Sequence, residues 1–157
     1  MHQIFLESAA RPLLVLHALV AAAALGASTH LAVTSVGLLR GRAQLGRVAR
    51  IHSQVIGLTF VAAFALGLLV YPTYRYYVRG LYLDRYAPWA SNLFDIKENL
   101  AALALPLALA LLAVGRRAET GGDRAAVRLV AFLGLALWAL TAFAVVSGLV
   151  ITSVKGL

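Results

Sequence analysis

The sequence predicts an all-α integral membrane protein, an up-down four-helix bundle with an aromatic and arginine-rich interfacial segment between helices 2 and 3. Three observations predict this class. The chain of 157 residues is 62% hydrophobic and only 13% charged, which is more apolar surface than a soluble domain of this size can bury. Four long stretches carry few or no charged residues, and the arginines gather in short segments between them.

Each apolar stretch is long enough to cross a hydrocarbon core of about 30 Å as a helix that rises about 1.5 Å per residue. The third stretch reaches this length only if its helix begins near Phe94 and carries the three charged residues of 95–98 in its first turns. The whole chain, 1–157, is then expected to form a single transmembrane domain. The expected spans are residues 12–39, 51–71, 94–115 and 129–154.

The distribution of arginine predicts the orientation. Segments 40–50 and 116–128 each hold four arginines, and short arginine-rich loops stay on the cytoplasmic side of a membrane. Between Pro72 and Glu98 four basic residues are spread out and nearly balanced by three acidic ones. The connection between spans two and three is therefore expected outside, together with both termini. This pattern is typical of a multi-pass protein of the cell inner (plasma) membrane.

Composition also excludes several kinds of site and partner. The absence of cysteine excludes a disulfide framework, a thiolate metal site and a cysteine nucleophile. The net charge of +8 does not indicate nucleic-acid binding, because the arginines lie where topology signals and lipid contacts belong. The expected partners are the lipid bilayer and other membrane-protein subunits or further copies of this chain.

Residues 72–93 form the expected outer interfacial segment, which is rich in tyrosine and arginine. Tyrosine and tryptophan favour the membrane interface, which indicates a helix lying flat on the membrane. The same residue types dominate protein interfaces, so the segment is also a candidate docking face. Pro72, Gly80 and Pro88 are expected to break it into short pieces. The candidate interface residues are Tyr74, Arg75, Tyr77, Arg79 and Trp89.

Ionisable residues inside a membrane span are costly in lipid and usually face the bundle interior, so they are candidate functional groups. His17 lies near the outer edge of the first span, His30 lies nearer its cytoplasmic end, and His52 opens the second span. Small residues share the helix faces of His17 and His30, which favours close approach of a neighbouring helix or a flat cofactor. The first span is therefore expected to be surrounded by protein.

Two histidines on one membrane helix suggest a haem b protein, in which neutral imidazoles ligate the iron. His17 and His30 are the candidate iron ligands. Thirteen residues rotate the second ring by roughly 220° relative to the first, so at most one bis-histidine haem is expected. Pairing His30 with His52 requires equal depths, but helix edges at Leu39 and Ile51 would separate them by roughly 12 Å.

His17 and Glu98 are the pair whose expected depths agree. A carboxylate beside an imidazole orients its tautomer, which suits proton exchange, a quinone hydroxyl or a second-shell metal contact. Two structural alternatives stay open. Glu98 can instead belong to a local ion network with its charged neighbours, and His30 can be a buried imidazole bonded to a hydroxyl such as that of Thr34.

These residues favour a small membrane subunit of a redox or electron-transport system. A haem b or a quinone would bind within the bundle at His17, His30, His52 and Glu98. The first alternative is an accessory or scaffold subunit that docks onto a larger complex without chemistry of its own. Whether the protein is an enzyme stays open on these residues alone.

A second alternative comes from the stretch Arg50-Ile51-His52-Ser53-Gln54 at the start of the second span. It resembles the R-x-H-x-N pattern that opens the second helix of the MAPEG family, four-helix membrane enzymes acting with glutathione or on eicosanoids. Gly57 stands where that pattern carries a glutamate. The resemblance implies a glutathione-dependent membrane enzyme.

Overall fold

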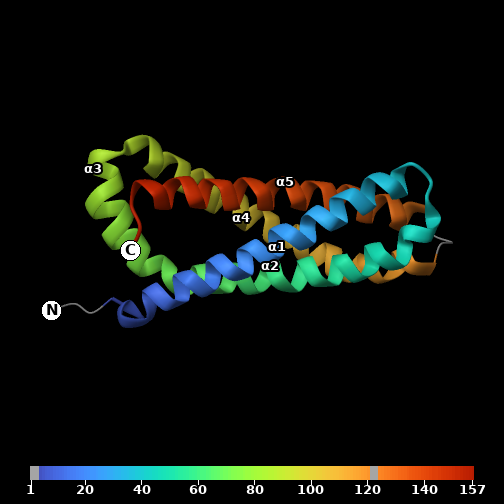
Figure 1. Cartoon of the computed structure of the whole chain (residues 1–157), viewed down its shortest axis with the longest axis horizontal. Helices are drawn as coiled ribbons and strands as arrows, with labels where there is room; N and C mark the ends of the chain where they lie inside the picture. The colour runs from blue at the N-terminus through green and yellow to red at the C-terminus, as the bar shows by residue number, and fades with distance from the viewer. Residues whose placement is uncertain (1–3, 121–123) are drawn as a thin grey trace.

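Four long helices make up most of the computed structural model, which describes residues 4–120 and 124–157 (Figure 1). Each of the four is long and apolar enough to cross a membrane, and the described ranges contain helices and no strand. The predicted fold class, an all-α membrane bundle, is confirmed. The long helices are α1 (Ala10–Leu39), α2 (Gly46–Tyr74), α4 (Pro88–Val114) and α5 (Arg124–Val154).

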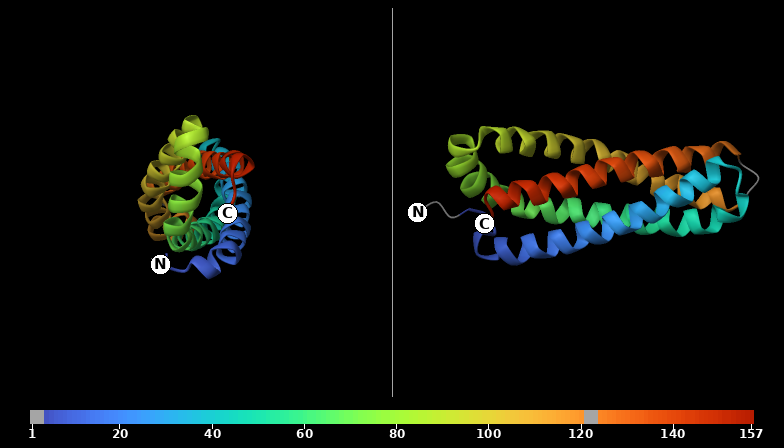
Figure 2. Two further views of the ribbon diagram at one scale, coloured as in Figure 1. Left: turned by 90° about the vertical axis from the view of Figure 1, so that its left-hand side faces the viewer. Right: turned by 45° about the horizontal axis from the view of Figure 1, so that its top comes forward.

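The helices run up and down along the long axis of the molecule (Figures 1 and 2). Helix α1 packs against α2 and α5, and α4 packs against the same two helices, so α1 and α4 lie on a diagonal. Helix α1 begins and α5 ends at the same end of the bundle (Figure 1), which we call the termini end. The opposite end, which we call the loop end, carries the connections that follow α1 and α4.

All four long helices begin before the apolar stretches that predicted them, and α1 does so by only two residues, at Ala10. Helix α2 begins at Gly46 rather than Ile51, α4 at Pro88, and α5 at Arg124. Arginine is a good helix former, so α2 and α5 continue through basic segments outside the hydrocarbon. Helix α4 instead begins at Pro88, because proline is favoured in the first turn of a helix. Hydrophobicity therefore marks the edge of the membrane, and it does not mark the first residue of the helix.

A helical segment closes the termini end of the bundle (Figure 1). Helix α2 contains Pro72 and continues directly into η3 (Arg75–Leu83), a π-helix, and then into α3 (Asp84–Tyr86). The predicted breaks at Pro72 and Gly80 are therefore wrong. The chain turns at Ala87 (φ −147°, ψ 63°), because the residue before a proline avoids helical geometry, and Pro88 then opens α4.

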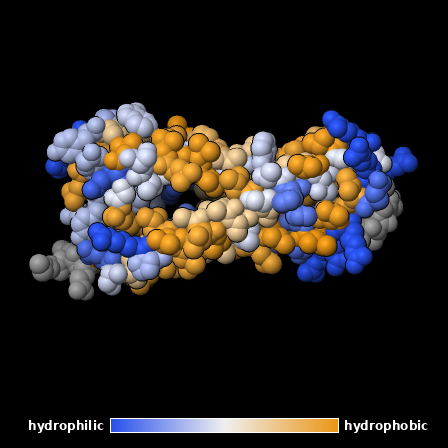
Figure 3. All heavy atoms as spheres, in the orientation of Figure 1, coloured by the Kyte–Doolittle hydropathy of each residue, from blue (hydrophilic) through white to orange (hydrophobic). Residues whose placement is uncertain are grey.

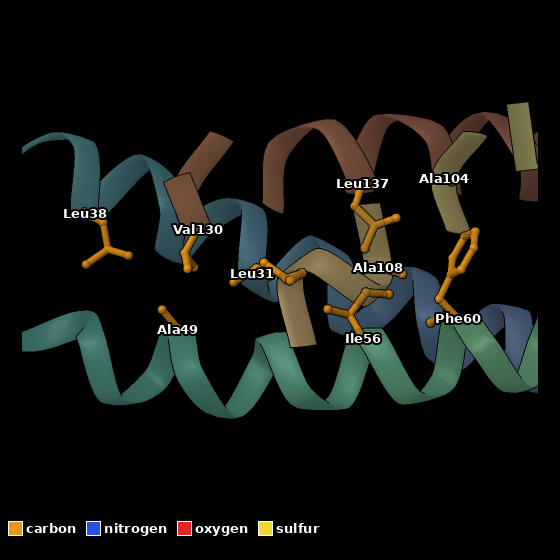
Figure 4. Close-up of a cluster of buried hydrophobic side chains, with 11 residues drawn as sticks. Leu31, Leu38, Ala49, Ile56, Phe60, Ala104, Ala108, Val130 and Leu137 are labelled. Atoms are coloured by element: carbon orange, nitrogen blue, oxygen red, sulfur yellow. The ribbon is translucent and has the colours of Figure 1, made fainter. Parts of the chain in front are cut away.

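The buried apolar side chains form two separate clusters. The first, the loop-half core, joins all four long helices through residues such as Leu31, Ile56, Ala108 and Leu137 (Figure 4). We call the segment that closes the termini end, residues 75–89, the crossing segment. The second cluster, the termini-end core, joins the crossing segment to the ends of the long helices. Its buried members are Val70, Tyr74, Val78, Leu83, Ala87, Ala90, Phe94 and Ile151.

Candidate functional site

A layer of the bundle between the two cores contains polar groups. The loop-half core reaches Ala24 on α1, Phe60 on α2 and Ala104 on α4, whereas the termini-end core begins at Val70 and Phe94. We call the intervening part of the four helices the polar layer. In Figure 3 the molecule is hollowed in this half, between α5 above and α1 below, and hydrophilic atoms show inside the hollow.

His17 of α1 is the central group of the polar layer. Its Nδ1 lies 2.8 Å from the carbonyl oxygen of Ala63 on α2. A carbonyl can only accept a hydrogen bond, so Nδ1 carries the proton and a neutral ring keeps its lone pair on Nε2. A Cβ built on Gly67 would lie 3.2 Å from Cε1 of His17. Helix α2 therefore supplies both the acceptor and the space for this ring.

Lys97 and Glu98 of α4 carry the charges nearest to this imidazole. Their side chains are joined at 3.3 Å, Nζ to Oε1, and are 19% and 35% exposed. Both charges lie close enough to His17 to influence its imidazole electrostatically. The hydrogen bond of His17 nevertheless goes to Ala63. Glu98 thus forms an ion pair with its neighbour Lys97, which is the structural alternative expected for it, and its pairing with His17 stays a prediction.

His30 and His52 lie in contact near the loop end. Their ring centroids are 5.4 Å apart with planes 20° from parallel, and Nδ1 of His52 lies 2.9 Å from the carbonyl oxygen of Val48. The predicted depth difference is wrong because α2 begins at Gly46. His30 lies nine residues before the end of α1 and His52 six after the start of α2, a difference of about 4–5 Å.

This histidine pair lies on the surface of the bundle. His30 is exposed and His52 is half-buried, so the expectation that His30 faces inward is wrong. The Thr34 hydroxyl donates to the backbone carbonyl of His30 at 2.8 Å, so this hydrogen bond does not involve the imidazole. A haem held by this pair would lie against lipid and outside the four helices. Within the described ranges, no cluster of three or more metal-ligating side chains occurs.

The start of α2 holds the stretch that resembles the MAPEG pattern. Here the Gln54 amide donates to the carbonyl oxygen of Leu112 on α4 at 3.0 Å, and His52 is bonded to Val48 of its own helix. Ser53 is fully buried against Gly115, since a Cβ built on that glycine would lie 2.6 Å from Cβ of Ser53. Two of the five motif side chains therefore take part in packing α2 against α4.

Arg79 forms one ion pair with α4 and a second within the crossing segment. Its Nη1 and Nη2 bind the two oxygens of Asp95 on α4 at 2.6 and 2.7 Å, and its Nε lies 3.7 Å from Asp84. Asp84 also accepts a hydrogen bond from Ser91. The Tyr77 hydroxyl donates to Glu7 at 2.5 Å. The segment is thus tied both to α4 and to the turn that precedes α1.

The five candidate interface residues divide into internal and exposed groups. Tyr74 is buried, stacks on Phe94 with centroids 5.5 Å apart, and its hydroxyl lies 3.4 Å from the Lys155 carbonyl oxygen. Arg79 is engaged with the two aspartates. Arg75 and Tyr77 lie on the surface, and Trp89 is 56% exposed. Only the exposed group is available to a partner.

The sequence analysis gave no role to three parts of this site. The Ala63 carbonyl has no side-chain signal, because any residue would present the same oxygen. The space at Gly67 is indicated only by a run of small residues on α2. Lys97 was expected only as a charged neighbour of Glu98, although a lysine inside a membrane-spanning helix is itself a signal of function.

Comparison of the chain with family models, with curated protein sequences and with solved structures finds no match.

Proposed function

We propose that this protein is a small subunit of a membrane redox system that binds the headgroup of a quinone in the polar layer. The observation that supports the proposal is the placement of His17, Lys97 and Glu98 around one layer of a membrane bundle. Ionisable groups in such a position are costly in lipid. Their cost is offset when they bind a polar ligand.

The three groups match the needs of a quinone and its reduced quinol. A quinone carbonyl requires a hydrogen-bond donor, which the Lys97 ammonium supplies, and a quinol hydroxyl requires an acceptor. The lone pair on Nε2 of His17 is such an acceptor, because the bond to Ala63 fixes the proton on Nδ1. The isoprenoid tail of the ligand would remain in the bilayer beside the hollow seen in Figure 3.

The same geometry favours a quinone over a haem b. A bis-histidine haem inside the bundle requires two imidazoles that face one interior space. His17 has no ring contact with another histidine in the described ranges, since His30 stacks with His52 on the surface. His17 alone can offer one axial ligand, so a haem is the alternative that the experiment below distinguishes.

Orientation forms part of the proposal. The loop end is strongly hydrophilic (Figure 3) and carries Arg40, Arg42, Arg47, Arg50, Arg116, Arg117, Arg124 and Arg128. The positive-inside rule then places this end in the cytoplasm and both termini outside, in the inner membrane. The polar layer would lie in the outer half of the bilayer.

The test measures ligand content and binding in the protein purified in detergent. We expect no Soret band, quinone in the organic extract, and saturable binding of a short-chain quinone. His17→Ala should weaken that binding by about fivefold or more, the equivalent of one lost hydrogen bond of about 1 kcal/mol. His30→Ala, a histidine on the surface of the same helix, should leave it unchanged. A Soret band that His17→Ala abolishes would identify the ligand as a haem and not a quinone. An equal loss of quinone binding in the His17→Ala and His30→Ala variants would exclude the polar layer as the binding site.

An accessory role is the second candidate, and exposed aromatic residues on the crossing segment favour it. Tyr76, Tyr86 and Trp89 are 53%, 72% and 56% exposed, and large aromatic residues are enriched where proteins dock. Replacing Tyr86 and Trp89 by Ala should release a co-purified membrane partner if this face docks. Unchanged co-purification would assign these rings to the membrane interface.

A further inference from the structure

We infer that α2 carries a binding site for an anionic phospholipid at the loop end, a site separate from the polar layer. A shallow groove of about 380 Å³ lies there, lined by Arg47, Arg50, Ile51, Gln54 and Val55. The proposal concerns the leaflet that faces the loop end, and it does not depend on a quinone ligand.

The basic part of the groove matches a phosphodiester. Arg47 and Arg50 are both exposed and lie three residues apart in the first turns of α2, so they share one face of the helix. Guanidinium groups bind phosphate oxygens in bidentate geometry, which lysine does not reproduce. Basic residues at the point where a membrane helix leaves the hydrocarbon attract anionic headgroups, and both arginines lie at that point of α2.

The apolar part of the groove matches an acyl chain. Ile51 and Val55 are 53% and 42% exposed, and Leu58, one turn further along α2, is 63% exposed. The spacing of four and then three residues places them in one stripe directly below the arginines. A phospholipid has the same order, with its phosphate outermost and its acyl chains towards the centre of the bilayer. A free phosphate would use only the arginines.

The bound lipid would support the contact between α2 and α4. Gln54, which lines the groove, donates to the Leu112 carbonyl oxygen of α4. A headgroup seated beside Gln54 therefore shields this hydrogen bond from water at the level where the helices leave the hydrocarbon. Binding to the folded bundle alone stabilises it by mass action.

The experiment counts lipids bound to the detergent-purified protein by native mass spectrometry, in titrations with phosphatidylglycerol and with phosphatidylcholine. We expect phosphatidylglycerol to bind more tightly. The Arg47→Gln/Arg50→Gln double variant should lose about thirtyfold in affinity for it, since each of the two basic residues near an anionic surface contributes on the order of one kcal/mol. The control is Arg124→Gln/Arg128→Gln, which removes the same charge from the loop end of α5. It should bind like the parent protein.

Three outcomes would overturn the site. Equal binding of the two lipids would exclude headgroup recognition, and equal loss in the control variant would show diffuse attraction to the basic end. Competition by glycerol phosphate as effective as that of the intact lipid would exclude the acyl stripe. If the double variant does not fold, Arg47→Gln alone should give an intermediate loss. In the Arg47→Gln/Arg50→Gln variant we expect weaker phosphatidylglycerol binding and unchanged quinone binding.

Discussion

The orientation of one imidazole decides the chemistry available in the polar layer. The His17 ring is held by a backbone carbonyl of α2, which already accepts a helical hydrogen bond and uses its second lone pair for Nδ1. A backbone partner does not titrate, so it fixes the tautomer without adding a charge to the membrane interior. The fixed tautomer presents Nε2 as an acceptor.

The close approach of Gly67 to His17 makes a specific prediction. Gly67→Val should displace the imidazole, because even a Cβ there would lie 3.2 Å from Cε1. We expect quinone affinity to fall by about fivefold or more, as for a lost hydrogen bond. Gly26→Val is the matched control, since no atom lies within 4 Å of a Cβ at Gly26. Equal affinity of the two variants would show that His17 does not need this space.

Arg79 and Asp95 provide the second prediction at this scale. The pair is bidentate but partly exposed, with side chains 22% and 43% accessible, so solvent screening limits its coupling to about 1 kcal/mol. A double-mutant cycle with Arg79→Ala and Asp95→Asn, measured by unfolding in mixed micelles, should give that value. Arg85→Ala, on the exposed side of α3, should change stability by less. A coupling energy near zero would mean that the pair does not fasten the crossing segment.

How much of the site the sequence could predict differs from residue to residue. The similar depth of His17 and Glu98 could be predicted from the sequence, because each lies about two or three turns after the start of its helix and both helices start at the termini end. The partner of His17 could not be predicted, since a backbone oxygen is present at every residue. The surface position of His30 could not be predicted either. The small residues on its face of α1 favour close packing, but they do not show whether another helix of this chain packs there.

The elements differ from their predicted form mainly at their ends. The four spans could be predicted because charge-free stretches of this length have few other structures available. The start of α2 at Gly46 could not, because its basic first turns look like a loop in hydropathy. The break expected at Pro72 is not present. A proline removes one donor and bends a helix, but packing of the crossing segment onto the termini-end core keeps the chain helical.

Contact between α2 and the end of α4 makes a prediction at the scale of elements. A Cβ at Gly115 would lie 2.6 Å from Cβ of Ser53, an atom that cannot move without the α2 backbone. Gly115→Ala should therefore destabilise the bundle by about 1–3 kcal/mol, as overpacking does in other cores. Gly26→Ala should be neutral or slightly stabilising, because alanine is the better helix former. Similar unfolding curves for the two variants would refute close packing at Gly115.

The whole molecule is asymmetric along its long axis. The loop end is strongly hydrophilic (Figure 3) and holds eight arginines, whereas the termini end combines aromatic residues with nearly balanced charge. The polar layer lies in the half nearer the termini, and the lipid groove lies at the loop end. The two proposed ligands therefore occupy opposite leaflets.

Topology can be tested directly because the natural chain has no cysteine. Single cysteines at Ser8 and Gln44, both exposed and at opposite ends of the bundle, would be treated with a membrane-impermeant maleimide in intact cells. Ser8→Cys should react from outside, and Gln44→Cys should react only after the membrane is permeabilised. The reverse pattern would invert the orientation and move the polar layer to the cytoplasmic half.

Photolabelling with an azidoquinone tests the central claim most directly, because it locates the ligand without relying on a variant. The protein would be irradiated with the probe in lipid nanodiscs, and the labelled residues would be identified by peptide mass spectrometry. Our account expects labelling on α1 around His17 and on α4 around Lys97, suppressed by excess unlabelled quinone. Labelling that is spread over the lipid-facing surface, or centred on His30 and His52, would contradict a quinone site in the polar layer.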